Sequence, residues 1–312
     1  FIHQLVVVLF QISVLYLKAR SLLPSYDSFK NQIGWSFRPV KSVLRFSLTI
    51  AITSSVWVFV TQTDKLVLSG ILSLSEYAYF TIAVVVAGGV LIISSPIGNA
   101  IMPRMTVLHA EENDEQLVNI YRKSTQFVSV IAGSASIVLA FCAEPLLYGW
   151  SGDVVLSANS SSILRLYAIG NGLLAMAAFP YYLQYAKGNL RLHLISNLVM
   201  VFFLVPSLIY AAINYGGVGA GYVWVVINFL YLVIWVGFIH KVFLPGLHFK
   251  WIFEDILVIV VPGLILGFCL SLIPFVSDSR TLNFIYVVFF GGCVLLITVA
   301  FRTLLNKRAV FT

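Results

Sequence analysis

The chain has 312 residues, of which 60% are hydrophobic and 10% are charged, and its mean hydropathy is +0.97. Because soluble domains carry about 25% charged residues, this composition excludes an ordinary soluble protein and indicates a multi-pass membrane protein. The net charge of +7 does not indicate nucleic-acid binding, since the basic residues lie at the ends of apolar stretches and form no cluster interleaved with aromatic residues.

Apolar stretches of about 20 residues, long enough to cross a bilayer as helices, recur along the whole chain. The longest charge-free run, 194–239, is broken only by the turn-forming segment 214–217 and therefore predicts two helices joined as a hairpin. The sequence thus predicts an all-α integral membrane protein, a polytopic helical bundle of about nine transmembrane helices at 1–18, 43–63, 77–98, 124–143, 162–185, 194–213, 218–239, 254–275 and 281–302.

The basic residues predict the orientation of these helices. When successive loops alternate between the two sides, 16 of the 19 Lys and Arg residues fall on one side, and only Lys65, Arg165 and Arg280 fall on the other. Cytoplasmic loops carry the excess of Lys and Arg in membrane proteins. We therefore expect the basic side, and with it the C-terminus, to be cytoplasmic.

Helix-breaking residues predict how the chain is divided. The basic segment 19–42 contains two prolines and a glycine and is the best candidate for a linker after helix 1–18. A compact six-helix group then occupies 43–240. A second basic loop introduces a separate two-helix hairpin and cytoplasmic tail at 241–312.

The helix at 43–63 carries a polar stripe. Ser54 and Thr61 lie seven residues apart on one helix face, and the stripe ends at Gln62, Asp64 and Lys65. Such a face can line a hydrophilic cavity. It can equally pack against another helix, because Ser and Thr are common at helix interfaces in membranes.

Basic residues at helix ends form two predicted levels. Arg45 and Arg104 lie near the cytoplasmic side, and Lys65 and Arg165 lie near the outer side. A guanidinium inside a helix boundary can bind a phosphate, although it can also extend to the headgroups or serve as a positive flank. The two levels suggest compensation for an anionic substrate that crosses the membrane.

Proline and glycine residues interrupt the span before Arg104. Pro96, Gly98 and Pro103 predict that this helix is bent or unwound near the cytoplasmic side. Interrupted helices free backbone groups that must be satisfied inside protein or a cavity, and they often mark transporter sites.

The sequence carries no signal of enzymatic chemistry. It has no Gly-rich phosphate loop, nucleophile elbow or His-Glu zinc motif, so no ATPase or catalytic site is predicted. The three cysteines lie in or at the edge of apolar spans and the five histidines do not recur at ligand spacing, so we expect no metal site.

Four segments resemble a known family: TQTDKLVLSGILSLSEYAYFTIA (61–83), SPIGNAIMPRM (95–105), FPYYLQYAKGNLRLH (179–193) and NYGGVGAGYVW (214–224). Their order and spacing over roughly 40 to 240 are similar to the Wzx-like polysaccharide flippases of bacterial O-antigen and capsule pathways. These flippases are a branch of the MATE-like transporter superfamily.

The resemblance implies a transporter with two six-helix lobes around a central cavity. On this basis 1–18 is the last helix of a truncated N-terminal lobe, 19–42 is the cytoplasmic interlobe linker, 43–240 is the C-terminal lobe, and 241–312 adds a further hairpin. The chain begins with Phe1 rather than Met and lacks most of the first lobe, so we expect it to be a fragment that does not transport alone.

The implied function is to flip undecaprenyl-diphosphate-linked oligosaccharide repeat units from the cytoplasmic to the periplasmic leaflet of the bacterial inner membrane. No cofactor is implied. The coupling source stays open: Asp64 could carry a proton or bind a cation, or it could be a solvated acid at the helix boundary. Implied partners are membrane lipids, an O-antigen polymerase and a chain-length regulator. The alternatives are a drug or lipid II exporter of the same superfamily, or a membrane enzyme such as an O-antigen polymerase.

The resemblance also implies roles for single residues. Of the residues at recurrent motif positions, Lys65 and Arg104 are expected to contact the substrate, whose diphosphate would explain the two cationic levels. The helix-breaking residues are expected to act in packing or gating; these are Pro96, Gly98, Pro103, Pro180 and Gly188.

Overall fold

The structure is a computed structural model that describes residues 2–22, 38–273, 275 and 277–311. Among these residues every regular element is a helix. The helices are α1 (Ile2–Leu22), α2 (Arg38–Ser69), α3 (Leu74–Ala110), α4 (Asp114–Phe141), α5 (Ala143–Ser151), α6 (Val154–Met176), α7 (Phe179–Ala186), α8 (Arg191–Leu230), the π-helix η2 (Tyr231–Trp235), α9 (Val236–Phe243), α10 (Leu247–Lys250), the π-helix η3 (Trp251–Leu257), α11 (Val258–Ser271) and α12 (Arg280–Phe311).

The chain divides into two compact units, Phe1–Ser47 and Leu48–Thr312. The first contains α1 and the beginning of α2. Most of the predicted linker, 19–42, consists of residues 23–37, which lie outside the described residues. The second unit contains all the other helices and is the part of the chain that carries the candidate site.

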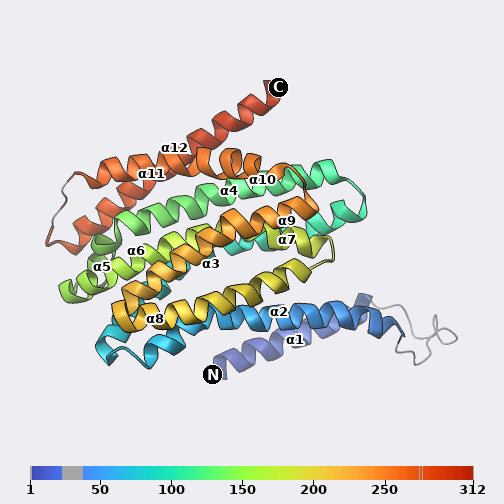
Figure 1. Ribbon diagram of the computed structural model, residues 1–312, viewed down its shortest axis with the longest axis horizontal. Coiled ribbons are helices and arrows are strands. Elements are labelled where there is room, and N and C mark those ends of the chain that lie inside the picture. Colours follow the sequence, from blue (N-terminus) through green and yellow to red (C-terminus); the bar gives the residue numbers. More distant parts are fainter. Residues whose placement is uncertain (1, 23–37, 274, 276, 312) are drawn as a thin grey trace. The chain divides into compact units, whose positions relative to one another are not determined.

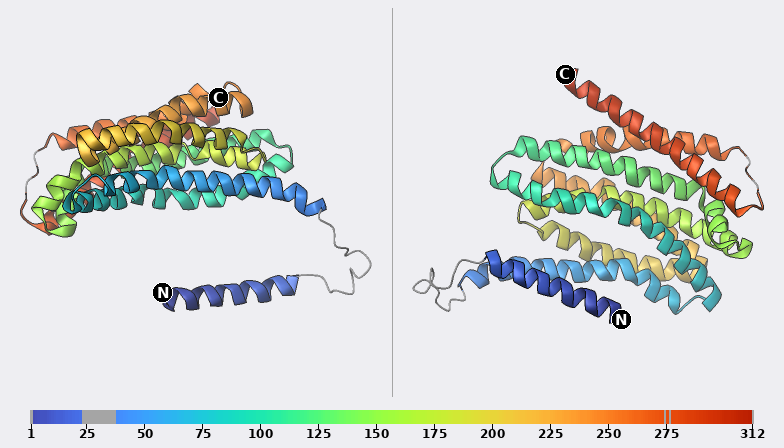
Figure 2. Two further views of the ribbon diagram at one scale, coloured as in Figure 1. Left: turned by 60° about the horizontal axis from the view of Figure 1, so that its bottom comes forward. Right: turned by 180° about the vertical axis from the view of Figure 1, so that it is seen from behind.

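Helix α6 lies at the centre of the second unit. It packs against α3, α4, α5 and α8, and these helices lie alongside one another in Figures 1 and 2. The last two helices, α11 and α12, pack against each other and against α4, and α12 also contacts α5. The final helix pair therefore belongs to the same compact unit as the six-helix group that precedes it.

Seven helical runs among the described residues are long and apolar enough to cross a membrane: His3–Leu22, Leu74–Ala110, Asp114–Phe141, Val154–Ala186, Arg191–Phe243, Leu247–Ser271 and Arg280–Leu305. The seven do not include α2, and they count Arg191–Phe243 once, which accounts for the difference from the nine predicted spans. The predicted class, a polytopic all-α membrane protein, is confirmed.

The run Arg191–Phe243 contains two passes rather than one. Its 53 residues would extend about 80 Å as a straight helix, against about 30 Å of hydrocarbon. Gly216 interrupts it with φ 59° and ψ −144°, and Figure 1 shows the chain reversing direction within α8. The hairpin lies at the predicted position.

Helix α3 begins with a capping box. The Glu76 amide donates to the Ser73 hydroxyl and the Glu76 carboxylate accepts from the Ser73 amide, which satisfies two amides at the start of the helix. From there α3 stays helical through Pro96 and Pro103 to Ala110. Of the two predicted alternatives, the unwound segment before Arg104 is therefore wrong, because a long helix surrounded by neighbours can retain its other backbone hydrogen bonds past a proline. A bend at this place stays a prediction.

Candidate functional site

A cavity of about 470 Å³ lies inside the second unit, between α2, α3, α6, α7, α8 and η2. Its volume is in the range of small-molecule sites, about 300–1,000 Å³. We call it the aromatic cavity; its lining residues are Thr53, Ser54, Trp57, Val58, Leu91, Ser94, Ser95, Gly98, Val128, Leu174, Ala175, Ala177, Ala178, Phe179, Tyr181, Tyr182, His193, Met200 and Tyr231.

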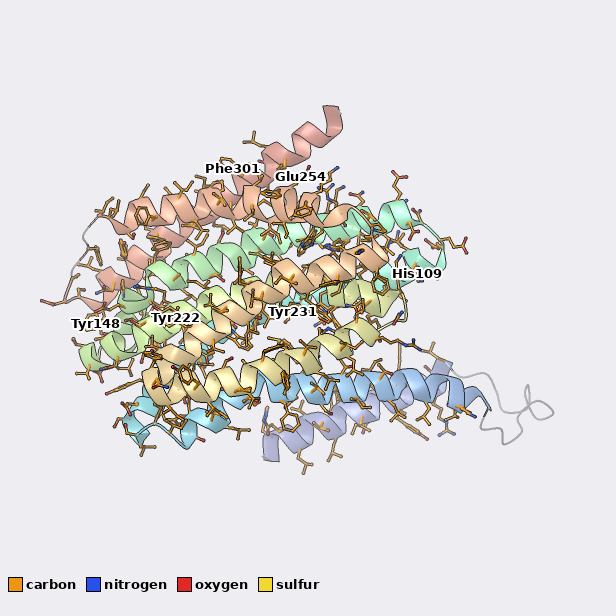
Figure 3. The ribbon with its side chains drawn as sticks, in the orientation of Figure 1. His109, Tyr148, Tyr222, Tyr231, Glu254 and Phe301 are labelled. Atoms are coloured by element: carbon orange, nitrogen blue, oxygen red, sulfur yellow. The ribbon has the colours of Figure 1, made fainter. Side chains whose placement is uncertain are left out.

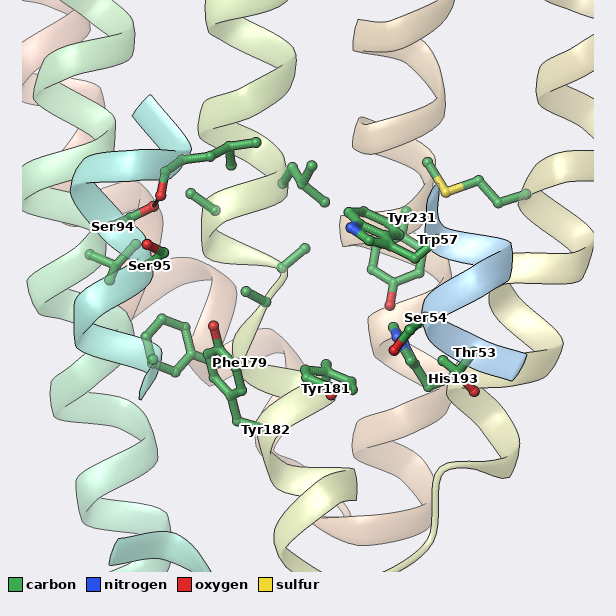
Figure 4. Close-up of a pocket in the computed structure, with 18 of the residues that line it drawn as sticks. Thr53, Ser54, Trp57, Ser94, Ser95, Phe179, Tyr181, Tyr182, His193 and Tyr231 are labelled. Atoms are coloured by element: carbon green, nitrogen blue, oxygen red, sulfur yellow. Dashed lines mark hydrogen bonds between the residues drawn. The ribbon is translucent and has the colours of Figure 1, made fainter. Parts of the chain in front are cut away.

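The walls of the aromatic cavity carry rings and hydroxyl groups but no Asp, Glu, Lys or Arg side chain. In Figure 4 one wall comes from α3 and α7 and the other from α2, α8 and η2. The labelled residues of the first wall are Ser94, Ser95, Phe179, Tyr181 and Tyr182, and those of the second are Thr53, Ser54, Trp57, His193 and Tyr231. Such a surface suits a ligand that has both apolar faces and hydroxyl groups.

The short helix α7 contributes the aromatic residues of the first wall. After α6 ends at Met176, the chain passes through one turn and α7 begins at Phe179, with Pro180 in its first turn. Proline fits the first turn of a helix because its φ is fixed near the helical value and its missing amide is not needed there. At the other end Gly188, with φ 66°, closes α7 and its amide donates to the Tyr185 carbonyl.

Gly98 allows this wall to approach α3. A Cβ atom built on Gly98 would lie within 2.6 Å of three atoms of the Tyr182 ring and hydroxyl, the nearest at 2.1 Å, so only glycine fits beneath the tyrosine as placed. The Tyr182 ring also makes edge contact with Phe179 at 5.6 Å between centroids. Gly98 therefore helps to set the position of an aromatic ring on the cavity wall.

Four polar groups on the cavity walls have no hydrogen-bond partner among the described residues: the Ser54 hydroxyl, the Tyr181 and Tyr182 hydroxyls, and the His193 imidazole. The His193 ring is held against Tyr181 at 4.5 Å between centroids. By contrast, Thr53, Ser94 and Ser95 donate to carbonyls of their own helices, as such residues commonly do in helices.

Asp64 lies away from this cavity and is paired. Its side chain is 7% exposed, and its carboxylate accepts hydrogen bonds from the Tyr167 hydroxyl at 2.9 Å and from the Lys65 amide at 2.8 Å. Tyr167 in turn stacks on Trp224 at 6.1 Å between centroids, and Trp224 donates to Asn171. Of the two alternatives for Asp64, the solvated helix-end residue is therefore excluded, because α6 supplies the carboxylate with a buried phenol.

The predicted polar stripe of α2 divides between these two surroundings. Ser54 faces the cavity, whereas the Thr61 hydroxyl donates to the Trp57 carbonyl and Gln62 accepts from the Lys65 ammonium at 2.9 Å. Ser54 therefore fits the cavity-lining interpretation and Asp64, paired with Tyr167, fits the helix-contact interpretation, whereas the hydrogen bonds of Thr61 and Gln62 stay within α2.

Of the predicted cations, Lys65, Arg104 and Arg165 do not line the cavity. Arg165 donates through Nε to the Ala140 carbonyl at 2.8 Å, near the C-terminal end of α4. Arg104 is exposed on α3, as are Pro96 and Pro103. The side chain of Arg45 lies outside the described residues. Substrate contact by these cations stays a prediction.

A second polar group ties α4 to η3, and we call it the polar clasp: Arg122, Gln126, Glu254 and Asp255. Arg122 donates to both carboxylate oxygens of Asp255, at 2.8 and 3.0 Å, and to Glu254 at 2.6 Å. The Asp255 side chain is fully buried. Figure 3 marks Glu254 on η3 and Tyr231 on η2, at separate places in the bundle.

Next to the polar clasp is a row of hydrogen bonds that we call the histidine chain: Tyr121, His240 and His248. The Tyr121 hydroxyl lies 2.7 Å from His240 Nε2, the two Nδ1 atoms of His240 and His248 lie 3.1 Å apart, and His248 Nε2 lies 2.9 Å from the Val233 carbonyl. A carbonyl only accepts, so with neutral rings His248 donates to Val233, His240 donates to His248, and Tyr121 donates to His240. The histidine pairing was not predicted, because it depends on the bend between α9 and α10.

Sequence reasoning missed most of the cavity. It selected Ser54 and Gly98 but not Trp57, Tyr181, Tyr182 or His193. The available signal was the aromatic cluster FPYYLQY directly after the small residues that end α6. No group of three or more His, Cys, Asp or Glu residues able to hold a metal occurs among the described residues.

Comparison with known proteins relates part of the chain to a family. Residues 6–153, just under half of the sequence, match a family model described as polysaccharide biosynthesis protein. This part of the chain is therefore similar to a polysaccharide biosynthesis family. This match confirms the resemblance that the sequence motifs predict. No curated protein matches the chain at a significant level.

A solved structure shares the fold. The lipid II flippase MurJ, in an inward closed conformation, matches with a TM-score of 0.64 at 14% sequence identity. The match covers 91% of this chain and 58% of that one, so the chain spans little more than half the length of the flippase that it resembles. At this identity the likeness shows the fold alone, a polytopic bundle of membrane helices.

Proposed function

We propose that this protein takes part in flipping an undecaprenyl-diphosphate-linked oligosaccharide from the cytoplasmic to the outer leaflet of a bacterial inner membrane, with its C-terminus in the cytoplasm. The observation that carries the proposal is a cavity of about 470 Å³, lined by rings and hydroxyl groups, inside a bundle of membrane helices. The matched family and the flippase fold support the same activity. The proposal makes the protein a transporter rather than an enzyme.

A lipid II flippase is the second candidate, and the structural likeness to MurJ favours it. The two candidates share their chemistry, since each moves a polyprenyl-diphosphate-linked saccharide. An O-antigen or capsule repeat unit is the better proposal because the matched family is one of polysaccharide biosynthesis. In that pathway an O-antigen polymerase and a chain-length regulator are the proposed partners.

A proton or cation gradient is the proposed energy source, with Asp64 as the ion carrier. Its carboxylate is buried in α2 and accepts two hydrogen bonds, one from the Tyr167 hydroxyl and one from the Lys65 amide. Replacing Asp64 with Asn should then uncouple transport from the gradient without removing the Tyr167 contact.

The test of the proposed function is deletion of the gene in its own bacterium, followed by re-expression of the full-length protein. The expected result is that lipid-linked repeat units accumulate in the deletion strain and are shielded from an impermeant glycan-labelling reagent applied to spheroplasts. Re-expression should restore labelling. If the protein fails to restore labelling but restores growth to a strain depleted of its lipid II flippase, the second candidate is favoured. If the protein changes neither the labelling of the deletion strain nor the growth of the depleted strain, both candidates are overturned.

A further inference from the structure

We propose that the aromatic cavity holds a neutral sugar residue of the lipid-linked glycan, against its aromatic walls, while the diphosphate binds elsewhere. This inference rests on the proposed function and specifies which part of the substrate the cavity recognises. It differs from the sequence-based expectation, in which cations bind the diphosphate along the path of the polar helix.

The cavity lacks the groups that bind a diphosphate. Buried phosphate oxygens need cationic side chains or free amides, because an unpaired charge in a low-dielectric interior is strongly disfavoured. No lining residue is cationic. Arg165 is committed to the Ala140 carbonyl, and the Lys65 ammonium bonds to Gln62 outside the cavity wall.

The start of α7 supplies few free amides. A helix N-terminus can bind phosphate through its first backbone N–H groups. Here the Tyr181 and Tyr182 amides donate to the Ala178 carbonyl, the Ala178 amide donates to Ala175, and Pro180 has no N–H. Only the Phe179 amide of this turn is without such a bond in the described part of the chain, and one neutral amide does not compensate the charge of a diphosphate.

The same walls suit a sugar. A pyranose ring presents C–H groups on its faces and hydroxyls around its edge, so it needs flat apolar surfaces next to polar groups. Trp57 lies on one wall and Tyr181 on the other, and each offers a ring face with a polar group at its edge. A site of this kind binds through shape and hydroxyl groups, and not through charge.

The four unpartnered groups supply the hydrogen bonds. The hydroxyls of Ser54, Tyr181 and Tyr182 can each donate and accept, and a neutral His193 imidazole does both through its two nitrogens. Sugar hydroxyls also donate and accept, so they can pair with all four. Binding would then supply the partners that the protein itself does not provide, including one for the buried Nδ1 atom of His193, which costs free energy when left unpaired.

The experiment measures labelling of lipid-linked oligosaccharide in spheroplasts of the deletion strain that express wild-type protein, Trp57→Ala, Trp57→Phe or the control Trp150→Ala. Trp150 is 55% exposed and lies outside the cavity. At equal membrane abundance, Trp57→Ala should slow the appearance of label about tenfold, the loss expected when one aromatic contact is removed. Trp57→Phe and Trp150→Ala should stay within about twofold of wild type.

A charge pair at Ser54 separates a sugar from a diphosphate. Ser54 is exposed to the cavity and its hydroxyl is unpartnered, so both Ser54→Asp and Ser54→Lys should fold. For a neutral sugar, the two variants should slow labelling to a similar extent. If Ser54→Lys is fully active and Ser54→Asp is inactive, an anion occupies the cavity and the inference is overturned. Full activity of Trp57→Ala would also overturn the inference, because the aromatic wall would then not contact the substrate. A wild-type protein that restores no labelling would instead overturn the proposed function.

Discussion

The polar clasp and the aromatic cavity both place polar side chains inside the helical bundle, yet their charges and pairing differ. In the clasp, a fully buried carboxylate is held by two hydrogen bonds from Arg122. In the cavity there is no charged side chain, and four polar groups lack partners. The comparison teaches that the charged residues of the clasp are committed to contacts between helices, whereas the unpartnered neutral groups of the cavity are free to bind a ligand.

The largest expected effect is on the polar clasp. Arg122→Ala would leave Asp255 as a buried, uncompensated carboxylate, which costs about 3–5 kcal/mol. We expect the thermal midpoint, followed by size-exclusion chromatography in detergent after heating, to fall by about 10 °C. The control is Lys123→Ala, at the adjacent exposed position. Equal midpoints for the two variants would show that the clasp is not structural.

A matched pair of tyrosines sharpens the comparison. Tyr121→Phe removes the donor to buried His240 and should cost about 1–3 kcal/mol of stability. Tyr182→Phe removes a hydroxyl with no partner, so its midpoint should stay near that of wild type while labelling of the lipid-linked glycan falls. The same heating assay measures both, and a larger loss of stability in Tyr182→Phe would contradict the distinction.

Arg165→Ala should have a smaller effect on stability. It removes one hydrogen bond to the Ala140 carbonyl at the end of α4, worth about 0.5–1.5 kcal/mol. Because this guanidinium does not line the cavity, flipping per molecule should be unchanged in the labelling assay. A stable variant with strongly reduced flipping would restore Arg165 to the substrate path.

The smallest effects are expected at Lys65 and Arg104. Neither residue lines the cavity, and Arg104 is exposed, so alanine substitutions should change stability by less than about 0.5 kcal/mol. Labelling should also be unaffected. A loss of flipping in both variants, with normal abundance, would support the cationic path that the sequence suggests and would show that the diphosphate uses a surface separate from the cavity.

The fold could be predicted from the sequence because its evidence is local. Long apolar stretches, the 214–217 turn and the distribution of Lys and Arg each depend on neighbouring residues. The continuity of α3 through Pro96 and Pro103 could not be predicted in this way. The effect of a proline depends on whether neighbouring helices hold the rest of the helix in place.

Most of the candidate site could not be predicted, because it depends on which distant residues become partners. Asp64 and Ser54 lie on the same predicted polar stripe, yet only Asp64 meets a phenol from α6. Arg165 resembles a phosphate ligand in the sequence but reaches a carbonyl 25 residues earlier in the chain. Pairing of this kind is a tertiary property that periodicity does not encode.

Substrate protection of a cysteine at Ser54 is the most direct test of whether the unpartnered neutral groups of the cavity contact the glycan. In a background without the three native cysteines, Ser54→Cys would be compared with Ser55→Cys, whose native hydroxyl bonds to the Ala51 carbonyl and which does not line the cavity. Maleimide labelling would be measured in strains that make or lack the lipid-linked oligosaccharide. The account predicts that the oligosaccharide slows labelling at position 54 and leaves position 55 unchanged; equal labelling at position 54 in the two strains would contradict it.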